Sequence, residues 1–276
     1  MDNYRIVDLP GIDFLGRREP SAILTKQISS ISSQFDKKEI MCECFGAAGW
    51  DMNFTDLLKT WKLLAVRGVN LPCLHLFAYS IEGQRKLDFP GYFSHQSVWW
   101  EKAKALTDEM SFINSTAIKG CETNDILVIN PVNSLAGYCI GGQTSQTITI
   151  EYKQLLKELD HSQYLYDIGD EDVMQNFATV SNARNIGNCS YSYVVLPVME
   201  SIRQSTLDIL TEFTKQGGKV LFIQKYPEYV DFERSEQLKE YLTQFENLPN
   251  KSITHARSLN LRKAFGFFGY KRKIKI

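Results

Sequence analysis

Short apolar segments alternate along the chain with longer segments in which apolar residues recur every three or four positions. The short segments are typical of buried strands, and the longer ones are typical of amphipathic helices. The predicted strands are residues 37–46, 69–80, 125–131, 164–171, 191–199 and 219–225. The predicted helices are residues 19–35, 53–68, 98–114, 150–159, 201–218 and 235–245. Because strands and helices alternate, the pattern predicts an α/β fold with parallel sheets.

The segments between these elements predict loops and a domain boundary. Residues 8–18 are expected to form a loop, and so is the Gly-, Ser- and Thr-rich stretch after Pro131. A change in composition divides the chain into domains of residues 1–118 and 119–276. The second is expected to be a doubly wound domain with a flavodoxin-like outline. No function is assigned to its basic C-terminal tail, residues 270–276.

Charge and hydropathy bear on the kind of partner. The formal net charge is −1, which gives no reason to expect nucleic acid or an anionic membrane as a partner. No apolar run approaches the roughly 20 residues of a membrane span. The first residues lack the basic start and apolar centre of a signal peptide. As written, the chain is expected to be soluble and not exported by itself, which leaves its localisation open.

The cysteine pattern argues against a metal or redox motif. None of the six cysteines belongs to a C-x-x-C pair, so zinc-ribbon and thioredoxin interpretations are weak. Most lie in apolar runs, where a free thiol behaves as a small core residue. We therefore expect reduced, buried cysteines at positions 42, 44, 73, 121, 139 and 189.

One carboxylate stands inside the predicted strand of residues 37–46. Glu43 lies between Cys42 and Cys44, just before the glycine-rich turn "FGAAGWD". Side chains alternate along a strand, so Glu43 faces away from both thiols. In α/β folds the chemistry lies at the carboxyl ends of strands, and Trp50 could offer an apolar face to a sugar ring. The alternative is that Glu43 is a surface carboxylate at a strand end.

The next predicted strand adds polar groups to the same edge. By the period of two, His75, Phe77 and Tyr79 share one face. The following loop is dense in polar and aromatic residues, among them Arg85 and Asp88. We expect these side chains to converge on the same opening as Glu43.

A longer run of motifs carries a family resemblance. The pieces, in chain order, are "DLPGIDFLGR", "KQISSISSQF", "ECFGAAGWDMNFTD" and "RGVNLPCLHLFAYSIEGQRKLDFPGYFSHQSVWW". Residues from about Leu9 to Asn114 thereby resemble the C-terminal part of the catalytic barrel in family-106 glycoside hydrolases, the α-L-rhamnosidase-like proteins. Residues from about Asp125 to Tyr229 resemble the flavodoxin- or amidotransferase-like domain that follows such barrels.

The resemblance implies a (β/α)₈ barrel, of which this chain holds about the last three βα units. It also implies hydrolysis of terminal L-rhamnosyl bonds. It implies that Glu43 is the catalytic base or nucleophile, because such enzymes use two carboxyl groups. Calcium dependence is also implied, without assignable ligands, as is a periplasmic or secreted location. The sugar-contacting candidates are Asp13, Trp50, His75, Tyr79, Arg85 and Asp88.

A complete barrel takes about 250 residues, and only about 115 precede the second domain here. We therefore expect a fragment of a glycoside hydrolase that is inactive without the missing barrel half. An open sheet edge favours a second chain or self-association. The alternative is a non-catalytic carbohydrate-binding or assembly protein. A third possibility is a free-standing α/β protein whose strands all join one sheet.

Overall fold

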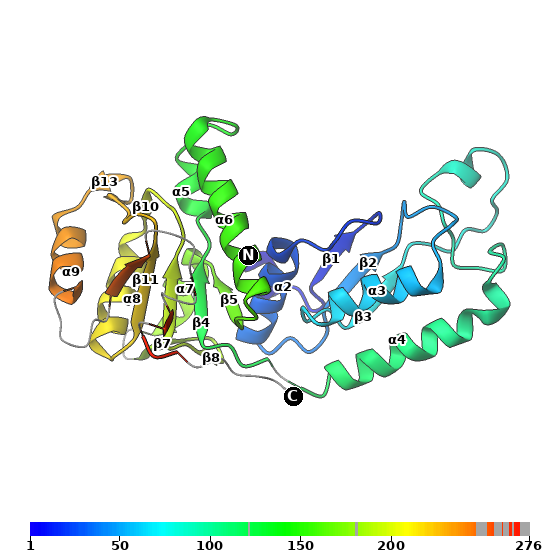
Figure 1. Cartoon of the computed structure of the whole chain (residues 1–276), viewed down its shortest axis with the longest axis horizontal. Coiled ribbons are helices and arrows are strands. Elements are labelled where there is room, and N and C mark those ends of the chain that lie inside the picture. Colours follow the sequence, from blue (N-terminus) through cyan, green and yellow to red (C-terminus); the bar gives the residue numbers. More distant parts are fainter. Residues whose placement is uncertain are drawn as a thin grey trace. The chain divides into compact units, whose positions relative to one another are not determined.

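The computed structural model describes residues 1–120, 122–179, 182–246, 253–256, 261, 265–266 and 268–270. The chain divides into two compact units, Asn3–Glu122 and Thr123–Ile276. Each unit has its own parallel sheet (Figure 1), so the interpretation in which all strands join one sheet is wrong. In the described residues no helix is long and apolar enough to cross a bilayer.

The first unit consists of three successive βα units. Its strands are parallel and lie in the order β1-β2-β3; they are β1 (Gly11–Phe14), β2 (Met41–Cys44) and β3 (Leu71–Leu74). A helix follows each strand: α2 (Ala22–Gln34), α3 (Phe54–Ala65) and, after two short 3₁₀ turns, α4 (Ala103–Ala117). The remaining elements are α1 (Asp2–Ile6), η1 (Gly83–Leu87) and η2 (Trp100–Lys102).

Alternation along the strands builds the core of this unit. Cys42 and Cys44 are fully buried and belong to the cluster that packs the sheet against its helices. Helix α3 adds Leu57, Trp61 and Leu64, which are spaced by four and three residues and so share one helical face. The opposite face of the sheet therefore carries the odd-numbered residues of the strands, which include Glu43.

The second unit contains a five-stranded parallel sheet in the order β14-β11-β9-β4-β5. Counted in chain order, the strands lie 2-1-3-4-5 across the sheet, so the winding reverses beside β4. The strands are β4 (Ile126–Ile129), β5 (Tyr166–Gly169), β9 (Tyr193–Leu196), β11 (Lys219–Ile223) and β14 (Ile253–Ala256). The helices are α5 (Val132–Ala136), α6 (Gln143–His161), α7 (Glu171–Phe177), α8 (Gln204–Lys215) and α9 (Glu236–Glu246).

Two small sheets complete the described part of this unit. One is antiparallel, in the order β6-β7-β8, and the other has the order β10-β12-β13. Their strands are β6 (Ala178–Thr179), β7 (Asn182–Ile186), β8 (Cys189–Ser190), β10 (Ser201–Ile202), β12 (Tyr229–Val230) and β13 (Glu233–Arg234). The basic tail lies outside the described residues, apart from Tyr270.

Two predicted loops are wrong. Residues 8–18 contain β1, whose backbone pairs with β2, because pairing with a neighbouring strand overrides the local turn signals. Helix α6 begins at Gln143 and not near Ile150. The hydroxyl groups of its first turns bond to carbonyls of the preceding turn, as Ser145 does to Gly142 at 2.9 Å, so these polar side chains are satisfied within the helix.

Two further expectations need correction. Strand β3 ends at Leu74, so the period of two does not extend to Phe77 and Tyr79, whose exposed fractions are 65% and 99%. Cys42 and Cys44 are buried as expected, but two of the described cysteines, Cys73 and Cys139, are exposed. Cys189 is half-buried, and all five described cysteines are free; Cys121 lies outside the described residues.

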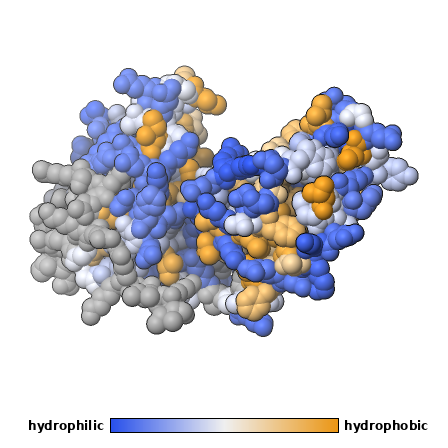
Figure 2. All heavy atoms as spheres, turned by 45° about the vertical axis from the view of Figure 1, so that its right-hand side comes forward, coloured by the Kyte–Doolittle hydropathy of each residue, from blue (hydrophilic) through white to orange (hydrophobic). Residues whose placement is uncertain are grey.

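Exposed hydrophobic side chains interrupt the hydrophilic surface seen in Figure 2. Val98 and Ile140 are completely exposed. Each belongs to a loop, and single apolar side chains of this kind are ordinary on protein surfaces. They give no reason by themselves to invoke a partner.

Candidate functional site

A row of three reactive side chains crosses the sheet of the first unit near the carboxyl ends of its strands. Asp13 in β1 is the Cα partner of Glu43 in β2, and Glu43 is the Cα partner of Cys73 in β3. Neighbouring strands lie about 4.8 Å apart, and paired residues face the same side of a sheet. The structure therefore brings Asp13 and Glu43 side by side.

His75 lies immediately beyond this row. Its backbone N–H donates to the carbonyl of Cys44 at 2.9 Å, which continues the β2–β3 pairing by one step. Its Nε2 lies 3.9 Å from Oε1 of Glu43, and the side chains of His75 and Glu43 are 15% and 44% exposed. Glu43 is thus open to solvent, whereas the imidazole beside it is largely enclosed.

Close packing fixes the imidazole of His75. A Cβ added to Gly46 would lie 2.7 Å from the ring Cγ and 2.6 Å from Cδ2 of Leu15, so only glycine fits there without a shift. On another side the ring of Phe89 meets the imidazole edge-on at 6.1 Å. Within the described residues, the buried Nδ1 of His75 has no hydrogen-bond partner. The ring is therefore held mainly by packing.

Trp50 belongs to a second group, formed by the loops after β2 and β3. Its Nε1 donates to the carbonyl of Lys86 at 3.0 Å, and its ring meets Tyr92 edge-on at 5.3 Å. The Tyr92 hydroxyl donates to the carbonyl of Arg85 at 2.7 Å. Arg85 and Asp88 form an exposed ion pair of 3.2 Å. These residues stabilise the two loops against each other.

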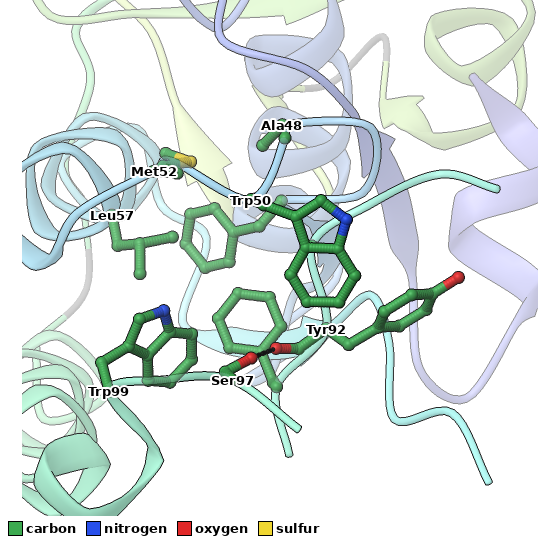
Figure 3. Close-up of a pocket in the computed structure, with 11 residues that line it drawn as sticks. Ala48, Trp50, Met52, Leu57, Tyr92, Ser97 and Trp99 are labelled. Carbon is green, nitrogen blue, oxygen red and sulfur yellow. Dashed lines mark hydrogen bonds between the residues drawn. The ribbon is translucent and has the colours of Figure 1, made fainter. Parts of the chain in front are cut away.

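These loops also enclose a small hollow, shown in Figure 3. Trp50 and Tyr92 lie on one side of it and Trp99 on another, and the hydroxyl of Ser97 donates to the carbonyl of Tyr92. Its free space is about 20 Å³, which suffices for one water molecule. A sugar ring does not fit inside, so any stacking on Trp50 uses the outer face of the indole. Trp50 as a whole residue is 37% exposed.

Tyr79 does not join either group. Its side chain is 99% exposed, and its carbonyl accepts a hydrogen bond of 3.4 Å from Gln96. The structure thus places Asp13 and His75 beside Glu43, whereas Tyr79 projects into solvent.

The sequence analysis missed Arg17, which follows β1. Its guanidinium donates to the carbonyl of Ala48 and to the carboxylate of Asp51. The hydrogen bond from Arg17 lowers the pKa of Asp51 below its ordinary value. On the other side of the same loop, the N–H of Gly49 donates to the carbonyl of Pro90 at 2.8 Å. Arg17 thus completes a chain of contacts through the loops after β1, β2 and β3.

The described residues offer little to a metal ion. They contain no group of three His, Cys, Asp or Glu side chains placed to hold one, so the calcium implied by the resemblance has no fitting carboxylate set there. The Cys44 thiol in the core is also unreactive. The neighbouring Cys42 thiol and burial raise the pKa of Cys44 far above its ordinary value, which keeps it protonated.

A buried polar network lies in the second unit, where the winding reverses. Glu171 is completely buried and accepts from the backbone N–H of Arg203 at 2.9 Å and from Nδ2 of Asn133 at 3.2 Å. Arg203 also pairs with Asp172 at 2.7 Å. Burial raises the pKa of Glu171 above its ordinary value. The network connects the loops that follow β4, β5 and β9.

Comparison with known proteins identifies the fold. No protein-family model matches the chain, and no curated protein matches it by sequence. Among solved structures, it is similar to a rhamnosidase from Novosphingobium sp. PP1Y, with a TM-score of 0.68 and 15% identity over 95% of this chain. The fold is that of part of a glycoside hydrolase.

Two further solved structures are similar to this chain. The GH42 exo-carrageenase from Bacteroides ovatus has a TM-score of 0.60 and 11% identity over 90% of this chain. Gan42B, a GH42 β-galactosidase from G. stearothermophilus, has a TM-score of 0.55 and 13% identity over 87% of this chain. The chain spans only 26%, 32% and 37% of the lengths of these three structures, in the order given.

Proposed function

We propose that this chain is part of a glycoside hydrolase that acts on terminal L-rhamnosyl or related bonds. Residues 1–118 would form about the last three βα units of a (β/α)₈ barrel. Residues 119–276 would form a flavodoxin- or amidotransferase-like domain. Three consecutive βα units support the first assignment, and the strand order 2-1-3-4-5, which is that of flavodoxin-like sheets, supports the second.

The observation that carries the proposal is the position of Glu43. It lies near the carboxyl end of the central strand β2, between Asp13 and Cys73, with His75 at 3.9 Å. Active sites of barrels lie at this end of the strands, and glycoside hydrolysis takes place between carboxyl groups. We assign Glu43 the role of base or nucleophile, and Asp13 and His75 contacts to the sugar.

The other candidates would form the rim of the opening. Trp50, Arg85 and Asp88 stabilise the loops around the site, and the outer faces of their side chains remain exposed. Tyr79 would meet only the more distant part of a long carbohydrate, because it is 99% exposed.

A second carboxyl group has to stand on the other side of the glycosidic bond, about 5 to 9.5 Å from the first. Asp13 and Glu43 lie side by side on the same face, so they would contact the same side of the sugar. We propose that further barrel strands, on this chain's continuation or on a second chain, supply the acid. The 276-residue chain should therefore bind sugar without hydrolysing it.

Calorimetric titration tests the sugar site. L-rhamnose is titrated into the wild type, into Glu43→Gln and into the matched control Glu39→Gln, whose exposed glutamate lies just before β2. We expect binding at least about tenfold weaker in Glu43→Gln, since a hydrogen bond to a charged group contributes about 1.5–3 kcal/mol. D-galactose serves as the competing sugar. Equal binding by both variants, with both folded, would refute the site.

A turnover assay separates the proposed function from its alternative, a non-catalytic carbohydrate-binding or assembly protein. The purified chain should release no product from an aryl α-L-rhamnoside. Addition of the missing barrel strands in trans should restore turnover, and Glu43→Gln should abolish it. Sugar binding that never leads to turnover in the completed barrel would favour the non-catalytic alternative.

A further inference from the structure

The carboxylate of Glu43 and the imidazole of His75 are close, yet they are not hydrogen-bonded to each other. Nε2 and Oε1 are 3.9 Å apart, whereas a direct N–H···O bond spans about 2.7–3.2 Å. Among the described residues, no donor lies within hydrogen-bond distance of the Glu43 carboxylate. Two strong hydrogen-bonding groups thus face one another across a short gap.

The surroundings of His75 indicate which nitrogen carries its proton. Nδ1 is buried and has no partner in the described part of the chain. A buried N–H without an acceptor is rarer than a buried acceptor without a donor, so the proton belongs on Nε2. That nitrogen faces the carboxylate, which favours the same tautomer. His75 therefore presents a donor to the gap, and Glu43 presents an acceptor.

A single oxygen atom fits between such a pair. Two hydrogen bonds of about 2.8 Å to atoms 3.9 Å apart meet at roughly 90° on a shared oxygen. The Glu43 side chain is 44% exposed, so a small outward movement brings this angle towards the tetrahedral value. The imidazole has less room to move, because Gly46 packs against the ring and Phe89 meets its edge.

We propose that Glu43 and His75 together bind one hydroxyl group. Its oxygen accepts a hydrogen bond from His75 Nε2–H, and its O–H donates a hydrogen bond to the Glu43 carboxylate. The oxygen belongs either to water or to a sugar hydroxyl, since both accept and donate in this way. That this occupant takes part in sugar chemistry rests on the proposed function, whereas the donor–acceptor pair itself does not.

Crystal structures of the whole chain, without sugar and soaked in L-rhamnose, test the bridging oxygen. We expect one ordered oxygen within about 3.2 Å of both Nε2 and Oε1. A water in both crystals assigns the position to water, and replacement by a sugar oxygen in the soaked crystal assigns it to a substrate hydroxyl. A direct bond between His75 and Glu43, or a gap with no ordered oxygen, overturns the proposal.

Nitrogen NMR of the imidazole rings provides a test in solution. At a pH where the imidazole is neutral, the ring ¹⁵N shifts should show the Nε2–H tautomer of His75 in the wild type and in Glu39→Gln. In Glu43→Gln the Nε2–H tautomer should be less populated, because the negative charge facing Nε2 is gone, while the flanking Asp13 and Cys73 are unchanged. At that pH, a proton on Nδ1 of His75 in the wild type overturns the proposal. This outcome is read from the wild type alone, so it does not depend on whether a variant folds.

The two proposals fail separately. If L-rhamnose does not bind in the calorimeter but the Nε2–H tautomer and the bridging oxygen are found, the sugar site is wrong and the pair remains. If the sugar binds through Glu43 but His75 carries its proton on Nδ1, the sugar site remains and the pair is wrong.

Discussion

The indole of Trp50 makes a hydrogen bond that a simple stacking platform would not need. Its Nε1 donates to the carbonyl of Lys86, and its ring edge packs on Tyr92. Both contacts stabilise the loop after β3 against the loop after β2. At this scale, a side chain that the sequence analysis assigned to the ligand is also a structural residue.

Replacement of Trp50 by phenylalanine removes this hydrogen bond and keeps an aromatic ring. We expect the free energy of unfolding to fall by about 1 kcal/mol, the typical contribution of such a bond. Urea denaturation measures it. Tyr79→Ala is the control, because a fully exposed side chain should change stability by no more than about 0.5 kcal/mol. An unchanged stability of Trp50→Phe would show that the bond contributes nothing in solution.

Gly46→Ala probes the close packing beside His75. The new Cβ would clash with Leu15 and with the imidazole, and overpacking of this kind destabilises by about 1–3 kcal/mol. In a His75→Ala background the loss should be smaller, because one of the two clashing groups is gone. Equal losses in both backgrounds, measured by urea denaturation, would place the strain at Leu15 alone.

At the scale of elements, most helices and central strands follow from local patterns. Strand β2 and helix α3 could be predicted because Cys42 and Cys44 alternate with Glu43, and because Leu57, Trp61 and Leu64 recur on one helical face. Strand β1 could not, since it has only four residues among turn signals. Its hydrogen bonds come from β2, about 30 residues away in sequence.

In the candidate site, too, features set by local pattern could be predicted, whereas contacts between distant residues could not. The orientation of Glu43 away from the thiols follows from alternation within one strand. The contacts of Arg17 with Ala48 and Asp51 join residues more than 30 positions apart, and no local pattern indicates them. The direction of Tyr79 could not be predicted either, because the chain leaves the strand before reaching it.

The buried network around Glu171 predicts a pH dependence of stability. Burial raises the pKa of this carboxyl in the folded protein, so the folded state holds its proton more tightly than the unfolded chain does. Its contribution to stability is complete below the unfolded pKa of about 4.3 and is lost as the pH rises through the raised pKa. The slope cannot exceed about 1.4 kcal/mol per pH unit for one group.

Glu171→Gln should remove this slope. Urea denaturation of both proteins between pH 4 and pH 8 should show the wild type losing stability relative to the variant as the pH rises. The exposed Glu236 provides the control, and Glu236→Gln should follow the wild type. Parallel curves for the wild type and Glu171→Gln would contradict the expectation.

At the scale of the whole molecule, the two units have separate sheets and separate cores. Between them lies an exposed stretch that includes Lys119 and Gly120. Exposed connections of this kind are preferred sites of proteolysis, whereas a buried sheet is protected.

Limited trypsin digestion should therefore cut first after Lys119. The fragment of residues 120–276 should remain folded, with a cooperative thermal transition by circular dichroism, because its five-stranded sheet is built entirely from its own residues. Lys119→Gln should slow this first cut. Loss of all secondary structure on cleavage would mean that the two units fold only together.

The contacts that join the three loops of the first unit constrain how this site can change in evolution. Arg17 binds the loop that carries Asp51, and Gly49 of the same loop binds Pro90 of the next. A substitution in one loop alters the position of its neighbour, so substitutions there should be epistatic. A new ligand preference would then arise through paired changes, and a transplant of the site should move all three loops together.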